Sequence, residues 1–149
     1  MTVAIRRARP DDLPAVSGLL IAEGLPLAGV PESFGEFLVA ESGGRQVAAA
    51  GLEVHGDVGL LRSVVVDSAF RGAGLGASLS EGILARARQN GLRSVYLLTT
   101  TAAEFFPRLG FHRIERRELP AVLNASEELR GACPDTAVAM VRDLAAEIT

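Results

Sequence analysis

The stretch Val64-Val65-Val66-Asp67-Ser68-Ala69-Phe70-Arg71-Gly72-Ala73-Gly74-Leu75-Gly76-Ala77 decides the fold. Its β-branched valines are typical of a strand, and the amphipathic pattern that starts at Leu75 predicts a helix. The glycines between them carry no side chains that would keep a ligand away from the backbone N–H groups. A helix N-terminus carries positive partial charge, and Arg71 adds a full positive charge beside it. The stretch therefore predicts a phosphate-binding loop between a strand and a helix.

Two common nucleotide-binding motifs do not match this loop. Its glycines follow the spacing G-x-G-x-G, whereas a Rossmann dinucleotide site has G-x-G-x-x-G and an acidic residue at the end of the next strand. Here the next strand ends in Thr99-Thr100-Thr101, without an acid. No Gly-Lys-Ser/Thr follows the loop, so it is not a P-loop. Dinucleotides and nucleoside triphosphates are therefore disfavoured as ligands.

The patterns on either side of the loop predict a single α/β domain over residues 1–149. Short glycine-containing turns separate the strands expected at 37–41, 46–54 and 59–67, which indicates an antiparallel meander. The helix after the loop ends at Asn90-Gly91, and a strand at 94–99 is then expected to run parallel to the strand before the loop. The sheet is therefore mixed. The other expected elements are a strand at 3–6, helices at 12–23, 101–109 and 120–131, and strands at 111–116 and 136–141.

The composition is typical of a globular domain with a small-molecule ligand. The 149 residues are 48% hydrophobic and 22% charged, with a formal net charge of −3. This charge, without any basic run, argues against nucleic-acid binding. No apolar segment is long enough for a signal peptide or a membrane span, so we expect a cytoplasmic protein without membrane contact.

The cysteine and histidine residues do not predict a metal site. Cys133 is the only cysteine, so no internal disulfide can form. It suits a small buried side chain, a thiol near the acceptor substrate or an acyl carrier. The two histidines lack the spacing of metal ligands, and we expect His55 in a turn and His112 exposed on its strand.

The order of these motifs resembles the GNAT superfamily of acyl-CoA-dependent N-acetyltransferases. The pattern R-x-x-G-x-G at 71–76 lies between a strand and a helix, and Phe105-Phe106-Pro107-Arg108-Leu109-Gly110-Phe111 matches a later motif of that family. The resemblance covers almost the whole chain. It implies an α/β (α+β) fold with a twisted, mixed, mainly antiparallel sheet, in which a central parallel pair of strands splays apart between flanking helices.

The resemblance also implies acetyl-CoA as co-substrate, bound along the glycine loop. A backbone N–H on the strand before the loop is expected to face the thioester carbonyl oxygen, a kind of contact that contributes roughly 3–4 kcal/mol in oxyanion holes. The residues expected to bind acetyl-CoA are Val64, Val65, Val66, Arg71, Gly72, Ala73, Gly74, Leu75, Gly76 and Ala77.

A closer resemblance is to the arsenic-resistance-associated N-acetyltransferase branch. It rests on Leu61-Arg62-Ser63, on residues 97–102, on the Phe105-Phe106 pair and on Cys133-Pro134-Asp135-Thr136-Ala137. That branch is similar to the acetyltransferase domain of N-acetylglutamate synthases, which implies a small amino-acid-like acceptor, including one that carries an arsenic or phosphinate group. A single thiol does not make a multi-thiolate arsenic site, so arsenic would enter only as part of an acetylated organic substrate.

Three polar residues within or at the end of apolar strands are candidates for the chemistry. Glu53 is either the catalytic base, with its pKa raised by desolvation, or a solvent-facing residue of an edge strand. Arg62 suits either a clamp for a substrate carboxylate or a structural ion pair. Thr99 lies at a strand end, where its hydroxyl is available to substrate. Phe106 stands where many GNAT enzymes carry a tyrosine general acid, so no fixed acid is expected there.

Two hypotheses follow for the activity. The first is direct acetyl transfer from acetyl-CoA to the amine of a small amino-acid-like molecule, with Glu53 or a water relay as base and no metal. The second is an acyl-CoA-binding regulatory module with little or no turnover. Exposed edges at the last strand or at the strand 37–41 would suit a symmetric homodimer.

Overall fold

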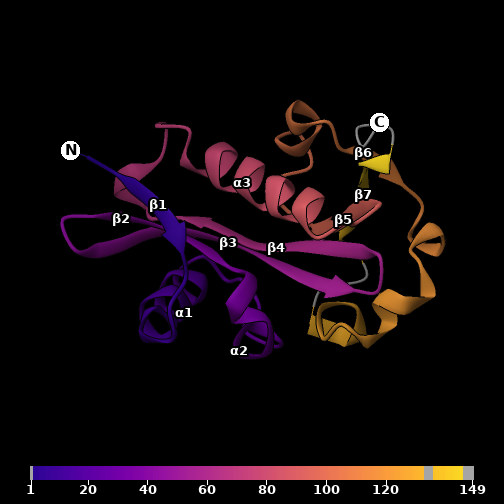
Figure 1. The fold of residues 1–149 in the computed structure, drawn as a ribbon, viewed down its shortest axis with the longest axis horizontal. Coiled ribbons are helices and arrows are strands. Elements are labelled where there is room, and N and C mark those ends of the chain that lie inside the picture. The colour runs from indigo at the N-terminus through magenta and orange to yellow at the C-terminus, as the bar shows by residue number, and fades with distance from the viewer. Residues whose placement is uncertain (1, 133–135, 146–149) are drawn as a thin grey trace.

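The computed structural model describes residues 2–132 and 136–145, which form a seven-stranded sheet with helices on both faces (Figure 1). The strand order is β1-β2-β3-β4-β5-β7-β6, and only β4 and β5 are paired in parallel within this part of the chain. The predicted mixed, mainly antiparallel fold is thereby confirmed. The elements are β1 Ala4–Arg7, α1 Leu13–Ala22, α2 Val30–Ser33, β2 Leu38–Ser42, β3 Arg45–His55, β4 Val58–Val66, α3 Leu75–Gln89, β5 Ser94–Thr99, β6 His112–Ile114 and β7 Val138–Asp143.

Alternating side chains of the strands build two main cores, one on each face of the sheet, and a third, smaller cluster forms around Val58, Leu60 and Leu123. Figure 1 shows α3 over one face and α1 and α2 over the other. On the α3 side, buried residues such as Leu79 and Ile83 pack against Leu52 and Leu97. The second core, on the side of α1 and α2, has the buried members Val16, Leu20, Val30, Phe34, Phe37, Val39, Ala49 and Val65. The sheet is thus buried on both faces where it carries the central strands.

The parallel pair of strands separates part-way along its length. Pairing between β4 and β5 runs from Val58 opposite Ser94 to Leu60 opposite Tyr96, and no later residue of β4 is paired with β5. Just beyond this point the β3–β4 register shifts between Ala49 and Gly51, so that one residue of β3 faces two of β4. Ser63 lies in this bulge with φ of 60°, an uncommon conformation for a residue other than glycine. The bulge turns the backbone of β4 at the place where the two strands part.

Several expectations for the second half of the chain are wrong. The segment expected as a helix at 120–131 forms a 3-10 turn at Ala121–Ala125 and a π-helical turn at Glu128–Ala132. The short helix expected from residue 101 begins only at Phe106. The edge strands are β1 and β6, not β7 and β2, because β7 lies between β5 and β6 while β2 lies between β1 and β3.

Two further expectations concern particular residues and the membrane. Cys133 lies outside the described residues. His112 is exposed on β6, as expected. No helix in residues 2–132 and 136–145 is long and apolar enough to cross a bilayer.

Gly51 of β3 gives a direct test of the packing beneath the bulge. A Cβ atom at this position would overlap the fully buried ring of Phe37. We expect Gly51→Ala to lower the free energy of unfolding by about 1–3 kcal/mol, because an overfilled core must shift side chains or backbone. Gly35→Ala is the matched control, since no atom lies within 4 Å of a Cβ built there. Urea denaturation of both variants checks this, and equal midpoints would contradict it.

Candidate active site

Two neighbouring cavities open where β4 and β5 separate. The first, of about 320 Å³, lies between the splayed strands and is lined by Arg62, Ser63, Thr99 and Glu128, among others. We call it the acceptor cavity. The second, of about 560 Å³, follows the end of β4 to the glycine loop. We call it the loop groove. The two share the lining residues Leu25, Val64, Thr101, Ala102 and Phe105. A ligand in the loop groove can therefore reach the acceptor cavity.

The loop groove has the geometry of a phosphate-binding site. Gly72 and Gly74 adopt φ of 88° and 77°, values that residues with side chains rarely take. Gly74 is the N-cap of α3, so the free N–H groups of this 15-residue helix begin at the groove. A Cβ on Gly76 would lie 3.6 Å from Phe105 and 3.8 Å from Val66, which shows that this glycine faces the groove wall. The groove thus combines an apolar wall with backbone donors at one end.

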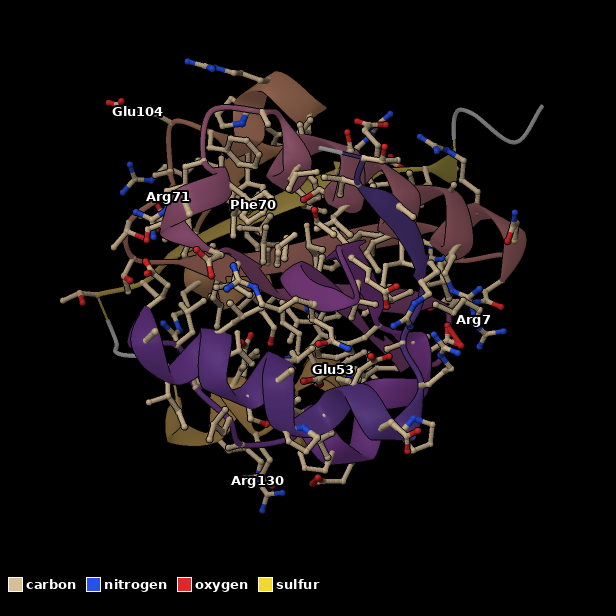
Figure 2. All side chains as sticks on the ribbon, turned by 90° about the vertical axis from the view of Figure 1, so that its left-hand side faces the viewer. Arg7, Glu53, Phe70, Arg71, Glu104 and Arg130 are labelled. Carbon is tan, nitrogen blue, oxygen red and sulfur yellow. The ribbon has the colours of Figure 1, made fainter. Side chains whose placement is uncertain are left out.

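The charged residue of the loop is paired with the end of α1. Arg71 forms an ion pair with Glu23, which follows the last residue of α1, and both side chains are partly exposed. Figure 2 shows Phe70 and Arg71 together at one side of the molecule, whereas Glu53 lies toward its interior. Exposed ion pairs are weak, so an anionic ligand in the groove can take the place of Glu23. Glu23 thereby lies in the groove wall.

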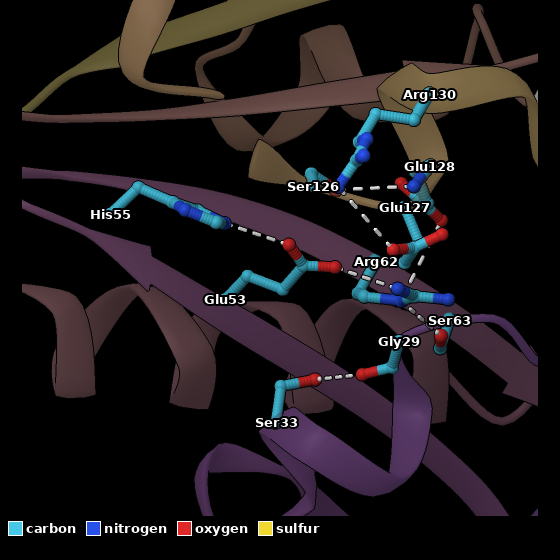
Figure 3. Close-up of polar contacts among 10 residues, drawn as sticks. All are labelled: Gly29, Ser33, Glu53, His55, Arg62, Ser63, Ser126, Glu127, Glu128 and Arg130. Atoms are coloured by element: carbon cyan, nitrogen blue, oxygen red, sulfur yellow. Dashed lines mark hydrogen bonds and ion pairs between the residues drawn. The ribbon is translucent and has the colours of Figure 1, made fainter. Parts of the chain in front are cut away.

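A buried ionic cluster forms one wall of the acceptor cavity (Figure 3). The Arg62 side chain is fully buried, and its Nη1 donates to Glu53 Oε2 over 2.6 Å. Its Nε donates to Ser63 Oγ over 3.0 Å, and its Nη2 donates to the carbonyl oxygen of Pro26 over 3.3 Å. Glu128 Oε1 lies 3.6 Å from the same Nε. One guanidinium therefore stands between two buried carboxylates.

Glu53 is buried, but its contacts differ from those expected of a catalytic base. Its Oε1 lies 2.8 Å from His55 Nε2, while its Oε2 accepts from Arg62. It lines a separate cavity near α2, together with His55 and Glu127, and is not part of the acceptor cavity lining. The solvent-facing alternative is wrong because Glu53 is only 7% exposed. His55 ends β3 rather than lying in the following turn.

Glu128 is a functional candidate that sequence reasoning missed. It is 4% exposed and lines the acceptor cavity, and its Oε2 has no hydrogen-bond partner among the described residues. Burial raises the pKa of Glu128 to about 7; Arg62 opposes this rise and the Glu53 carboxylate adds to it. In the sequence it is one of two adjacent acids in a polar segment, which carries no signal of burial.

The two remaining candidates at the end of β5 have clear local roles. Thr99 is 9% exposed, and its Oγ1 accepts a hydrogen bond from the backbone N–H of Ala102 over 3.0 Å, so it caps the turn that follows β5. Its own hydroxyl proton stays available in the acceptor cavity. Phe106 is buried in edge-to-face contacts with Phe105 and Phe111, so its position supplies no acid.

No three His, Cys, Asp or Glu side chains gather as a potential metal site in the parts of the chain that the structure describes. The cavities are instead served by backbone donors, hydroxyls and the cluster around Arg62. Such a set of groups suits proton transfer and the stabilisation of developing charge.

Comparison with known proteins identifies the family. Residues 33–113, which include β4, the loop and α3, match the model of the acetyltransferase (GNAT) domain. The chain belongs to the GNAT acetyltransferase family. It is also 37% identical over 122 residues to an amino-acid acetyltransferase of Mycobacterium tuberculosis, with 74% of this chain and 69% of that protein covered. GNAT membership and this relative make the chain an N-acetyltransferase that uses acetyl-CoA as co-substrate.

Further relatives of this GNAT enzyme include two much longer proteins and one of similar length. An amino-acid acetyltransferase of Azotobacter vinelandii is 37% identical over 89 residues, but the match spans only 21% of its length. The N-acetylglutamate synthase of Neisseria gonorrhoeae, complexed with coenzyme A and N-acetyl-glutamate, superposes with a TM-score of 0.82 and 25% identity over 97% of this chain and 35% of that one. A Mycobacterium tuberculosis protein, Rv2747, solved with CoA, gives a TM-score of 0.78 and 29% identity over 95% of this chain and 99% of that one.

The raised pKa of Glu128 makes the stability of this GNAT enzyme depend on pH. Between the ordinary value of 4.5 and about 7, the folded state holds a proton on Glu128 that the unfolded state has lost. The free energy of unfolding therefore falls as pH rises through this window, by up to roughly 3 kcal/mol from this group. We expect Glu128→Gln to remove that part of the decline. Urea denaturation across the window checks this, and parallel curves for the two proteins would refute it.

Proposed function

We propose that this enzyme acetylates the amine of a small amino acid, whose carboxylate Arg62 binds in the acceptor cavity. The observation that carries the proposal is a fully buried guanidinium in the wall of the cavity, at the point where β4 and β5 part. Buried arginine is suited to carboxylates because its planar N–H groups match their geometry. The amino-acid acetyltransferase from Mycobacterium tuberculosis and the N-acetyl-glutamate complex of the Neisseria enzyme support the same class of acceptor.

Acetyl-CoA is proposed to lie along the loop groove. Val64, Val65 and Val66 flank the pantetheine arm, and the segment Arg71 to Ala77 surrounds the pyrophosphate, with Arg71 released from Glu23. The support is the conformation of Gly72 and Gly74 and the start of α3 at the groove. This position directs the acetyl end toward the acceptor cavity, because Val64 and Phe105 line both cavities.

The acceptor is proposed to be held by groups on both splayed strands. Arg62 on β4 binds its carboxylate, and Thr99 on β5 offers its hydroxyl proton. Bound acetyl-CoA supplies an activated carbonyl carbon. The bulge at Ser63 leaves one residue of β4 outside the regular ladder, and a backbone N–H freed there is proposed to donate to the carbonyl oxygen. An amino acid enters with its amine protonated, so the site also needs a group that removes a proton.

A panel of acceptors tests the proposal. Steady-state release of CoA thiol is measured with glutamate, glutamine and aspartate as acceptors. We expect at least one of the three to be acetylated. For the accepted amino acid, replacing the α-carboxylate by the neutral α-amide is expected to lower kcat/KM by about 100-fold or more, because the charge-assisted hydrogen bonds from Arg62 to the substrate carboxylate are then lost. A phosphinic and an arsenic-bearing glutamate analogue test the narrower acceptor class suggested by the sequence. Equal rates for acid and amide would remove the role assigned to Arg62.

A glycine in the first turn of α3 tests the location of acetyl-CoA. Gly76→Glu places a carboxylate in the groove with contacts no closer than 3.6 Å for its Cβ, so the fold is retained. The added bulk and negative charge are expected to raise the dissociation constant of CoA by about tenfold or more. Gly18→Glu on α1 is the control, since its Cβ has no neighbour within 4 Å. Isothermal titration calorimetry decides, and an unchanged constant for Gly76→Glu would place acetyl-CoA elsewhere.

A further inference from the structure

Glu128 is held in the acceptor cavity without the partners that a buried carboxylate normally has. Its segment is fixed by a hydrogen bond from its own N–H to Ser126 Oγ over 3.2 Å, and Leu129 packs against the small core of Val58, Leu60 and Leu123. Its Oε2 is buried and unpartnered among the described residues. A buried polar atom without a hydrogen-bond partner lowers the stability of the folded state. A ligand that supplies the missing hydrogen bond explains why such an atom is present.

Of the two carboxylates beside Arg62, Glu128 makes the weaker contact with the guanidinium. Glu53 takes a short hydrogen bond of 2.6 Å from Nη1, whereas Glu128 approaches Nε only to 3.6 Å. The Nε hydrogen bond goes to Ser63 instead. Two carboxylates and one guanidinium carry a net negative charge when both acids are ionised. A cation, or a proton on Glu128, balances it.

The charged groups that face Glu128 come from several elements. Arg62 on β4 attracts its ionised form, and Glu53 on β3 repels it. His55 on β3 contacts the far oxygen of Glu53. Glu127 on the same segment is half-exposed and pairs with Arg130 at 3.7 Å. Burial together with Glu53 outweighs Arg62, so the pKa of Glu128 lies near 7, where a carboxylate accepts and releases protons readily.

We propose that Glu128 is the catalytic base that takes the proton from the ammonium group of the acceptor. This proposal rests on the proposed function. The terminal torsion of a glutamate is soft, so a small rotation presents an oxygen of Glu128 to the cavity that it lines. A zwitterionic amino acid then meets both charges of the cluster. Its carboxylate faces Arg62 and its ammonium faces Glu128.

The acceptor nitrogen loses two protons during acetyl transfer. One N–H bond of the ammonium breaks, its electron pair stays on nitrogen, and an O–H bond forms on Glu128. The free amine forms the new C–N bond to the acetyl carbon, and the C–S bond breaks with its electron pair on sulfur. The second proton lost by nitrogen goes to that sulfur and leaves as the thiol. Glu128 returns its proton to water after the products leave.

Glu53 is assigned a different part, as a positioning residue that acts through Arg62. Its carboxylate is held at both oxygens and is absent from the lining of the acceptor cavity. It holds the guanidinium in place and raises the pKa of Glu128 by its charge. Replacing Glu53 therefore changes the pH at which Glu128 works, while replacing Glu128 removes the base.

The kinetic test compares three variants with the accepted amino acid and saturating acetyl-CoA. We expect Glu128→Gln to lower kcat by about 100-fold or more with a much smaller change in KM, and to abolish the acid limb of the kcat/KM profile. Glu53→Gln is expected to keep an acid limb but to move it to lower pH. Glu127→Gln, an adjacent carboxylate outside the acceptor cavity, is the matched control and is expected to match the wild type. CoA binding by each variant confirms that it is folded.

A second measurement needs neither turnover nor acetyl-CoA. In protein labelled with 13C at glutamate side chains, the carboxyl resonance that disappears in Glu128→Gln is expected to titrate near pH 7, in agreement with the acid limb of kcat/KM. The same resonance is expected to titrate lower in Glu53→Gln. Titration in the ordinary range of a glutamate, or an intact acid limb in Glu128→Gln, would overturn the assignment. A wild type that acetylates no amino acid would instead refute the proposed function, while the resonance still reports on Glu128.

Discussion

The loss of hydrogen bonding between β4 and β5 beyond Leu60 and Tyr96 is the constraint on which the site depends. Backbone N–H and C=O groups need partners, so two strands that separate inside a sheet create a place that a ligand must complete. The separation is stabilised from both sides. β4 stays paired to β3 through the bulge, and β5 stays paired to β7 along Ser94–Thr99. The cavity therefore has rigid walls, each belonging to an intact part of the sheet.

The same separation explains why charged side chains are buried next to the apolar core. Arg62 extends from β4 into the space that β5 has left, where a neutral core residue would face an incomplete wall. A guanidinium in such a place must be neutralised, and β3 supplies Glu53 for this. The segment 121–132 then places Glu128 beside the cluster. The guanidinium of Arg62 already donates to Glu53, so Glu128 approaches it less closely. The order of contacts, short to Glu53 and long to Glu128, gives two neighbouring carboxylates different properties.

The parts of this arrangement that sequence predicts are those that depend on local pattern. The loop 71–77 and the helix from Leu75 are set by glycine spacing and helical periodicity, and both lie where expected. Glu53 and Arg62 stand out because each interrupts an apolar strand, although only the structure shows that they pair with each other. Glu128 gives no such signal, because its burial depends on where the segment 121–132 packs against β4. The helix expected there is absent, since the tertiary contacts favour two tight turns over a continuous helix.

The strand order of the sheet also depends on tertiary contacts that local sequence pattern does not predict, as the position of β7 shows. The sequence predicts that the last strand exists. However, β6 and β7 are both short, and their patterns do not decide which of them pairs with β5. The structure places β7 there, paired antiparallel over Ser94–Thr99, and β6 outside it. This order brings the chain leaving β6 around the end of the sheet, so that the segment carrying Glu128 returns over β4 before β7 begins (Figure 1). The strand order thus delivers Glu128 to the wall of the acceptor cavity, next to Arg62.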